Sequence, residues 1–298
     1  MEWNQLLSDR RFGKEYVAKS AAERRTEFQR DYDRLIFSAA FRRMQNKTQV
    51  FPLPGSVFVH NRLTHSLEVS SVGRSLGADV AALLQQRDSA AGDRTPEALG
   101  AIVSAACLAH DMGNPPFGHS GERAIRSFFA EGQGREWEKM LPKSVWKDIV
   151  NFDGNANTFR LLTHQFNGHR AGGFVMTYAT LAAIVKYPFA SDCCRGKSKF
   201  GFFQSEAADF RRIAAELGLP NCAASDESLR FARHPLVYLV EAADDICYQI
   251  MDLEDAHKLR LLSDEQAEAL LLDFFAPEER ERLRSAYPMV TDANDRMV

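Results

Sequence analysis

Apolar residues recur at steps of three and four along most of this chain, and this spacing constrains its fold more than any other feature of the sequence. Residues at that spacing lie on one face of an α-helix, whereas a half-buried β-strand alternates apolar and polar residues. Alternating stretches are scarce in this sequence. We therefore predict an all-α fold, a helical bundle whose members bury a shared core.

Three of the predicted helices carry an ionisable residue within an apolar face. The first can be capped by Thr64 and includes His65, the second ends with His110, and the third begins near Pro235 and includes Asp244. An ionisable group among apolar neighbours needs a partner, so these positions are candidates for function. The apolar residues of the three faces are Val69, Val72 and Leu76; Leu99, Ile102, Val103, Ala106 and Cys107; and Val237, Val240, Cys247 and Met251.

The composition is that of a globular chain that can bury a sizeable core. Of its 298 residues, 45% are apolar and 26% are charged. We expect one large domain or two closely packed ones, divided into an N-terminal helical arm (1–47), a core (48–256) and a C-terminal helical segment (257–298). The formal net charge of -3 gives no overall attraction to nucleic acid or anionic membranes, so any anion site must be local.

Neither a signal peptide nor a transmembrane helix is expected. The first twenty residues contain several charged side chains, among them Glu2, Asp9 and Arg10, and no stretch approaches eighteen uninterrupted apolar residues. We therefore expect a cytoplasmic protein with no membrane partner. The five cysteines form no CxxC pair, which favours reduced packing thiols over a disulfide framework.

His65, His110, Asp111 and Asp244 are candidates for a metal site. Two imidazoles and two carboxylates that converge from three helices would form a mixed nitrogen and oxygen cage, suited to Mn²⁺, Fe²⁺, Mg²⁺, Ni²⁺ or Zn²⁺. The alternative is that the His-Asp pair only satisfies backbone groups at the end of its helix. Asp245 competes with Asp244, but helical phase favours Asp244 and leaves Asp245 behind the ligands or in a structural salt bridge.

The order of these residues resembles the H…HD…D signature of the HD superfamily. Longer motifs, between about Asp31 and Asp255, resemble the bacterial deoxyguanosinetriphosphate (dGTP) triphosphohydrolases, and in kind the mammalian HD-domain dNTP triphosphohydrolase. These motifs are RLTHSLEVSSVGRSLG (62–77), AHDMGNPPFGHSGE (109–122), DGNANTF (153–159), KYP (186–188) and EAADDICYQIMDLED (241–255).

The resemblance implies an HD-domain helical bundle with the metal site between core helices. It also implies a metal-dependent hydrolysis of dGTP, or of other dNTPs as well, to a deoxynucleoside and inorganic triphosphate. In the implied reaction the metal, with Mn²⁺ or Mg²⁺ favoured, polarises the α-phosphate and lowers the pKa of a bound water, which attacks as hydroxide. The core segment would then be the phosphohydrolase domain.

His119 and Glu122 are the candidate pair for proton transfer. They stand three residues apart after a Pro-Pro turn, so on a helix the carboxylate can accept a hydrogen bond from the imidazole and raise its pKa. The resemblance implies that His119 acts as general acid and protonates the departing 5′-oxygen. The alternative is a helix-capping pair on the surface.

The resemblance further implies residues that contact substrate. Gln49 and Val50 resemble the segment that closes on the deoxyribose, and Tyr248 and Asp252, four and eight residues after Asp244, resemble contacts to the sugar. Further matches, to phosphate or sugar contacts or to a family motif, are Arg62, Asn155, Lys186 and Tyr187. For Arg62 and Lys186 the alternative is an ordinary solvated side chain.

Two stretches without clear helical spacing, 151–157 and 186–203, are rich in Gly, Asn, Lys and aromatic residues. Ligand-binding groups commonly lie on such irregular segments of a helical scaffold. We therefore expect part of the site to come from these two stretches.

Two alternatives to this function remain. Another HD phosphohydrolase would act on a nucleoside monophosphate, a cyclic dinucleotide or an alarmone, whereas a nucleic-acid-binding HD protein would bind single strands without turnover. The resemblance also implies a homo-oligomer and an effector that is single-stranded DNA or a dNTP. Family members are usually considerably longer, with C-terminal residues that close the base pocket. We therefore expect 257–298 to be a shortened segment and the base preference to be the least determined property.

Overall fold

The computed structural model describes residues 1–15, 24–52, 55, 58–87, 95–167, 171–194, 198–223 and 229–286, without the side chains of 95–97. Within these ranges the regular structure is helical, and the only β-type pairings are isolated bridges. The predicted all-α fold is therefore confirmed.

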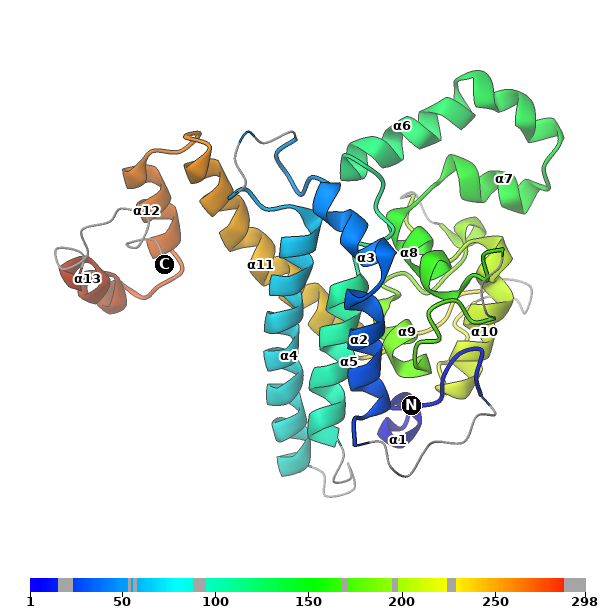
Figure 1. Ribbon diagram of the computed structural model, residues 1–298, viewed down its shortest axis with the longest axis horizontal. Coiled ribbons are helices and arrows are strands. Elements are labelled where there is room, and N and C mark those ends of the chain that lie inside the picture. The colour runs from blue at the N-terminus through cyan, green and yellow to red at the C-terminus, as the bar shows by residue number, and fades with distance from the viewer. Residues whose placement is uncertain are drawn as a thin grey trace.

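The helices follow one another through the whole described chain (Figure 1). The α-helices are α1 (Trp3–Leu6), α2 (Glu27–Ile36), α3 (Ala39–Arg42), α4 (Arg62–Arg87), α5 (Thr95–Ala109), α6 (Gly118–Ala130), α7 (Lys143–Val150), α8 (Gly154–Thr163), α9 (Tyr178–Ile184), α10 (Ala207–Glu216), α11 (Val237–Lys258), α12 (Asp264–Leu272) and α13 (Pro277–Ala286). Short 3-10 helices are η1 (Arg43–Asn46), η3 (Gln133–Lys139), η4 (Ser191–Cys193) and η5 (Gln204–Glu206).

Helix α5 is the centre of the bundle and packs against α2, α4, α9 and α11. The sequence predicts one apolar face for this helix, but Ala105 and Leu108, outside that face, are also fully buried. A helix that is apolar all round is covered on all sides. The end of α5 therefore delivers the next residues of the chain into the interior of the bundle.

Glycines let α4 and α5 approach each other closely. A Cβ atom at Gly77 would lie only 2.8 Å from the Cα of Gly100, and one at Gly73 only 2.5 Å from the Sγ of Cys107. Any larger residue at Gly77 would therefore push the two backbones apart. This close packing sets the distance between α4, which carries His65, and α5, which ends one residue before His110.

The apolar faces predicted for the other two helices are confirmed. On α11 the four predicted apolar residues are buried, and on α4 Val69 is buried while Val72 and Leu76 pack against the core. The predicted cap of α4 is wrong. The helix begins at Arg62, and the side chain of Asn61 accepts hydrogen bonds from the backbone N–H groups of Leu63 and Thr64.

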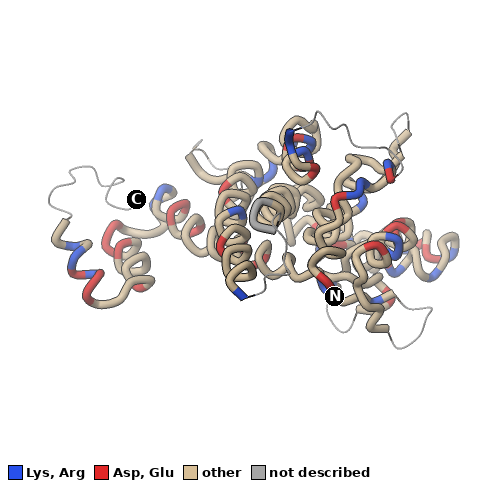
Figure 2. Tube along the Cα trace, turned by 90° about the horizontal axis from the view of Figure 1, so that it is seen from below, with Lys and Arg blue, Asp and Glu red and all other residues tan. Residues whose placement is uncertain are grey.

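The segments outside the central bundle differ in how closely they pack. Phe28, Leu35, Phe41 and Met44 of the first 47 residues join the same core as α5. By contrast, α6 and α7 project together from one side, and α12 and α13 lie beyond the end of α11 (Figure 1). Basic and acidic residues intermingle along the outer helices (Figure 2), as the small net charge suggests. No helix in the described ranges is long and apolar enough to cross a membrane.

His60 connects the segment before α4 to the end of α11 through hydrogen bonds. Its Nδ1 lies 2.8 Å from Asp255 Oδ1, its Nε2 lies 3.1 Å from Glu68 Oε1, and its backbone N–H donates to Asp255. The hydrogen bond to Glu68 raises the pKa of His60, burial opposes this, and Asp255 adds to the rise, so that the pKa is about 9 instead of 6.5. His60 is therefore charged in the folded protein at neutral pH.

We expect this histidine to make stability depend on pH. Because its folded pKa lies above the unfolded value, its contribution is fully present below about pH 6.5 and is lost as the pH rises through about 9, by at most roughly 3 kcal/mol. Urea denaturation of the wild type and of His60→Gln between pH 6 and 10 measures this, since all other titrating groups are common to both proteins. Parallel curves for the two proteins would contradict the expectation.

Candidate metal centre and active site

The His110-Asp111 pair lies in a tight turn directly after α5. Thr158 on α8 holds this turn, because its hydroxyl accepts from the N–H of Gly113 at 2.9 Å and donates to the carbonyl of His110 at 3.1 Å. A Cβ atom at Gly113 would lie 2.1 Å from the backbone nitrogen of Thr158. Only glycine therefore allows the turn to pack against α8.

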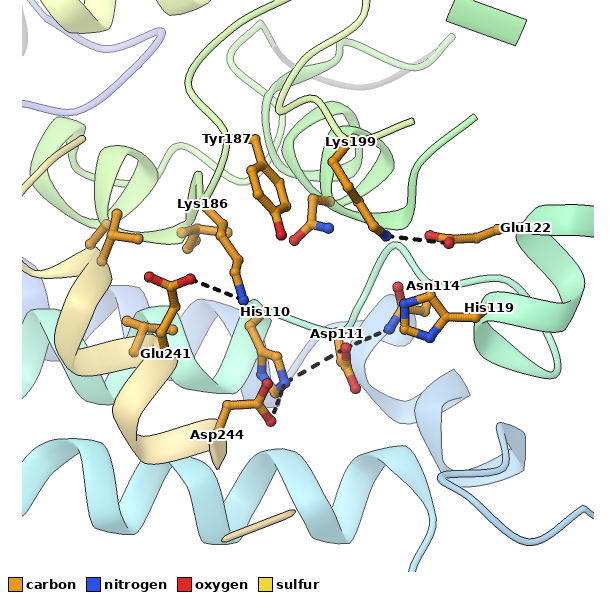
Figure 3. A pocket seen from close by; sticks show the side chains of 15 residues that line it. His110, Asp111, Asn114, His119, Glu122, Lys186, Tyr187, Lys199, Glu241 and Asp244 are labelled. Carbon is orange, nitrogen blue, oxygen red and sulfur yellow. Dashed lines mark hydrogen bonds and ion pairs between the residues drawn. The ribbon is translucent and has the colours of Figure 1, made fainter. Parts of the chain in front are cut away.

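The four side chains predicted as metal ligands converge from three parts of the bundle. One atom each of His65, His110 and Asp111 lies within 4.8 Å of the others. From α11, Asp244 Oδ1 lies 3.0 Å from His65 Nε2. The same oxygen lies 3.5 Å from His110 Nε2 (Figure 3). Asp245 is exposed on the same helix. The carboxylate that helical phase favours, that of Asp244, is therefore the one that faces the imidazoles.

The chemistry of this cluster fits a divalent metal ion. His110 Nδ1 lies 2.6 Å from the carbonyl of Cys107 and can donate to it, which leaves the Nε2 lone pair free. This Nε2 is buried, has no hydrogen bond of normal geometry among the described residues, and faces Asp244 Oδ1 at 3.5 Å. Neighbouring donor atoms 3.0–3.6 Å apart suit ligands that bind one ion at about 2.0–2.2 Å. Two carboxylates with neutral imidazoles carry two negative charges, of which the buried Arg62 beside Asp111 balances one, so the cluster still attracts a cation.

The protonation of the cluster follows the same balance of charge. Burial lowers the pKa of His110, but the charge of Asp111 and the nearby carboxylate of Asp244 outweigh it and raise the pKa to about 9. Burial raises the pKa of Asp244, but the imidazole of His110 at 3.5 Å and the hydrogen bond with His65 bring the value well below the usual range. A proton on the imidazole and a cation among the four side chains are therefore alternative ways to neutralise the buried carboxylates.

Arg62 supports the cluster from the start of α4. Its guanidinium is buried and forms an ion pair with Asp111 Oδ2. The resemblance implies a contact to substrate for this residue, whereas the partner found in the structure is a carboxylate of the candidate cage. Burial raises the pKa of Asp111, but the nearby His110 and then Arg62 lower it more, so the pKa lies below its usual value.

A cavity of about 170 Å³ opens beside the cluster (Figure 3). The structure brings eight of the predicted site residues to its wall: His110, Asp111, His119, Glu122, Asn155, Lys186, Tyr187 and Asp244. It does not bring Gln49, Val50, Tyr248 or Asp252 there. Val50 and Tyr248 are instead exposed, at 44% and 52%.

Two lysines supply positive charge on the cavity wall. Lys186 Nζ lies 3.0 Å from Glu241 Oε1, and Lys199 Nζ lies 3.5 Å from Glu122 Oε2 and 3.6 Å from Asp153 Oδ2. They extend into the cavity on either side of Tyr187 (Figure 3). Sequence reasoning did not single out Lys199, Asn114 or Glu241. The only signal for Lys199 was its place in the irregular stretch 186–203.

The predicted hydrogen bond between His119 and Glu122 is not found among the described residues. His119 is exposed near the start of α6 and lines the cavity. Glu122 is buried, accepts from the N–H of Gly154 at 2.7 Å and faces Lys199 and Arg126. A buried carboxylate is best compensated by a cation and a backbone donor, so these partners replace the imidazole.

Comparisons with known proteins agree with this geometry. A profile of the HD domain family matches residues 62–150, a range that contains three of the four clustered residues and both residues of the proton-transfer pair. Asp244 lies outside the matched range.

Curated relatives match far more of the chain. It is 46% identical to the deoxyguanosinetriphosphate triphosphohydrolase-like protein of Pseudomonas aeruginosa, over 97% of this chain and 64% of the relative. A protein of the same name from Synechocystis is 45% identical, over 88% and 61%. The deoxyguanosinetriphosphate triphosphohydrolase of Yersinia enterocolitica is 36% identical, over 89% and 57%. This chain thus spans less than two thirds of the length of these relatives. The chain is therefore similar to the HD domain family over residues 62–150 and is related, over nearly its whole length, to bacterial proteins named deoxyguanosinetriphosphate triphosphohydrolase-like.

Proposed function

We propose that this protein is a divalent-metal-dependent triphosphohydrolase that converts a dNTP, with dGTP favoured, to a deoxynucleoside and inorganic triphosphate. The observation that carries the proposal is the convergence of two imidazoles and two carboxylates at a cavity that also presents two lysines and a further histidine. The names of the relatives supply the substrate class.

The metal would be held by His65, His110, Asp111 and Asp244, with Mn²⁺ or Mg²⁺ favoured. When bound, such an ion polarises a phosphate and lowers the pKa of a water molecule. Arg62 keeps Asp111 in place through their buried ion pair. The mixed donor set does not by itself choose between the candidate metals.

The lysines on the cavity wall would bind the triphosphate. Each of them has a carboxylate partner, Glu241 for Lys186 and Glu122 for Lys199, so both ammonium groups are already oriented before substrate arrives. Phosphate oxygens form charge-assisted hydrogen bonds with such groups. Tyr187 and Asn155 line the same wall and would complete the polar surface.

His119 would donate a proton to the departing 5′-oxygen. It lines the cavity from α6, so its ring reaches the same space as the metal cluster and Lys199 (Figure 3). Histidine is the side chain best suited to proton transfer near neutral pH. Glu122 would orient Lys199, which is proposed to bind the triphosphate, and would not assist His119 directly.

The cavity encloses only part of a nucleotide. Pockets that enclose drug-sized ligands have about 300–1,000 Å³, whereas this one has about 170 Å³. We therefore propose that the phosphates enter the cavity and that the sugar and base lie at its mouth, where Gln49, Val50, Tyr248 and Asp252 would contact the sugar. The homo-oligomer, the single-stranded DNA or dNTP effector and the cytoplasmic location stay predictions.

The products distinguish this reaction from those of other phosphohydrolases. With Mn²⁺ and a panel of dNTPs, we expect equal amounts of deoxynucleoside and tripolyphosphate. In ¹⁸O-water the label should enter the triphosphate and not the deoxynucleoside, because attack occurs at phosphorus. Chromatography with mass spectrometry reads both outcomes. Pyrophosphate together with labelled dNMP would point to a different phosphohydrolase and reject the proposal.

A further inference from the structure

The three residues that follow His110 and Asp111 each accept a hydrogen bond at their backbone carbonyl. In each case the donor is a side chain that is distant in the sequence. Lys47 Nζ donates to the carbonyls of Met112 at 3.0 Å and Asn114 at 2.7 Å. Between these two, the carbonyl of Gly113 accepts from Asn157 Nδ2 at 2.7 Å. The path of the backbone after Asp111 is therefore held from two sides, by α8 and by the residue that follows η1.

Lys47 is also joined to the cluster through its own backbone. Its carbonyl accepts the N–H of Arg62 at 3.0 Å, and the guanidinium of Arg62 pairs with Asp111. Lys47 thus contacts the surroundings of Asp111 in two ways. Its side chain binds the turn that follows Asp111, and its backbone carbonyl binds Arg62, whose guanidinium pairs with the Asp111 carboxylate. The side chain is half-buried and does not line the cavity.

Few side chains could replace this one. The two carbonyls belong to residues two apart in the turn, and one group must donate to both. An ammonium has three donors and a long flexible stem, so it can reach both oxygens at once. An apolar side chain of the same length would leave both carbonyls without that donor and would free the turn to move.

We propose that Lys47 is a positioning residue of the metal centre, which holds Asp111 in the geometry that a divalent ion requires. The proposal rests on the proposed metal site but not on the identity of the substrate. Lys47 also stands two residues before Gln49, so it joins the segment proposed to contact the sugar to the turn that carries the ligands.

Metal affinity tests this directly and needs no nucleotide. The full chain is stripped of metal and titrated with Mn²⁺, and free Mn²⁺ is measured by electron paramagnetic resonance. We expect Lys47→Met to raise the Mn²⁺ dissociation constant by roughly 10- to 100-fold, the range typical of groups that orient metal ligands. Lys47→Arg should recover most of the affinity, because a guanidinium can donate to both carbonyls.

Lys139→Met is the matched control. Lys139 is exposed on η3 and does not line the cavity, so its loss should change the dissociation constant less than twofold. If Lys47→Met does not fold, Lys47→Ser, whose hydroxyl is too short to reach either carbonyl, is measured against the same criterion. A folded Lys47→Met or Lys47→Ser that binds Mn²⁺ as tightly as the wild type would overturn the proposal. A wild type that binds Mn²⁺ but hydrolyses no dNTP would reject only the proposed reaction.

Discussion

Replacing either His110 or Asp111 by alanine should release the metal and abolish hydrolysis. The variant His110→Ala removes a nitrogen whose lone pair has no other partner in the described structure. The variant Asp111→Ala removes a carboxylate and leaves Arg62 buried without its ion-pair partner. Breaking a buried charge pair costs about 3–5 kcal/mol of folding stability, so Asp111→Ala should also be the less stable variant. In both variants the remaining ligands should bind the ion at least roughly 100-fold more weakly, because losing a group that only orients a ligand already costs about 10- to 100-fold in affinity.

Elemental analysis of the purified variants, together with Mn²⁺ titration, measures this loss. Circular dichroism shows whether each variant is folded. The matched control is Asp245→Ala, which removes an exposed carboxylate next to Asp244 on the same helix and should leave the metal content unchanged. Full metal occupancy in folded His110→Ala and Asp111→Ala would remove both residues from the ligand set.

The parts of the site that could be predicted are those that helical spacing determines. Spacing places Asp244 among apolar neighbours on α11 and leaves Asp245 on the solvent side, and the structure agrees. The same reasoning put His65 and His110 on faces that meet. A helix fixes the direction of each side chain relative to its neighbours, so local sequence carries this information.

The parts that could not be predicted depend on contacts between distant segments. Lys199 meets Glu122 across 77 residues and Lys47 meets Met112 across 65, and nothing in the local sequence specifies either partner. The expected bond between His119 and Glu122 shows the same limit, because a favourable spacing of three was outweighed by a lysine and a backbone N–H from elsewhere. At the start of α4, Asn61 and Thr64 are both good caps, and propensity alone does not choose between them.

Replacing His119 by alanine should stop turnover while metal and substrate still bind. His119 lines the cavity but is exposed and belongs to neither the buried cluster nor the core, so its loss should leave the fold and the metal site intact. A deoxynucleoside 5′-alkoxide is a poor leaving group, and protonating it as the bond breaks is worth roughly 10²- to 10⁴-fold in rate. An interaction made only in the transition state lowers kcat and kcat/KM together.

Steady-state kinetics of His119→Ala, with Mn²⁺ affinity measured in parallel, test this role. The comparison variant is Glu122→Gln, which keeps an acceptor for the N–H of Gly154 but removes the charge that faces Lys199. We expect this variant to change KM more than kcat and to lose less activity than His119→Ala, because the glutamate acts on the group proposed to bind phosphate. If His119→Ala instead retains the wild-type kcat and only raises KM, then His119 binds phosphate and another group must supply the proton.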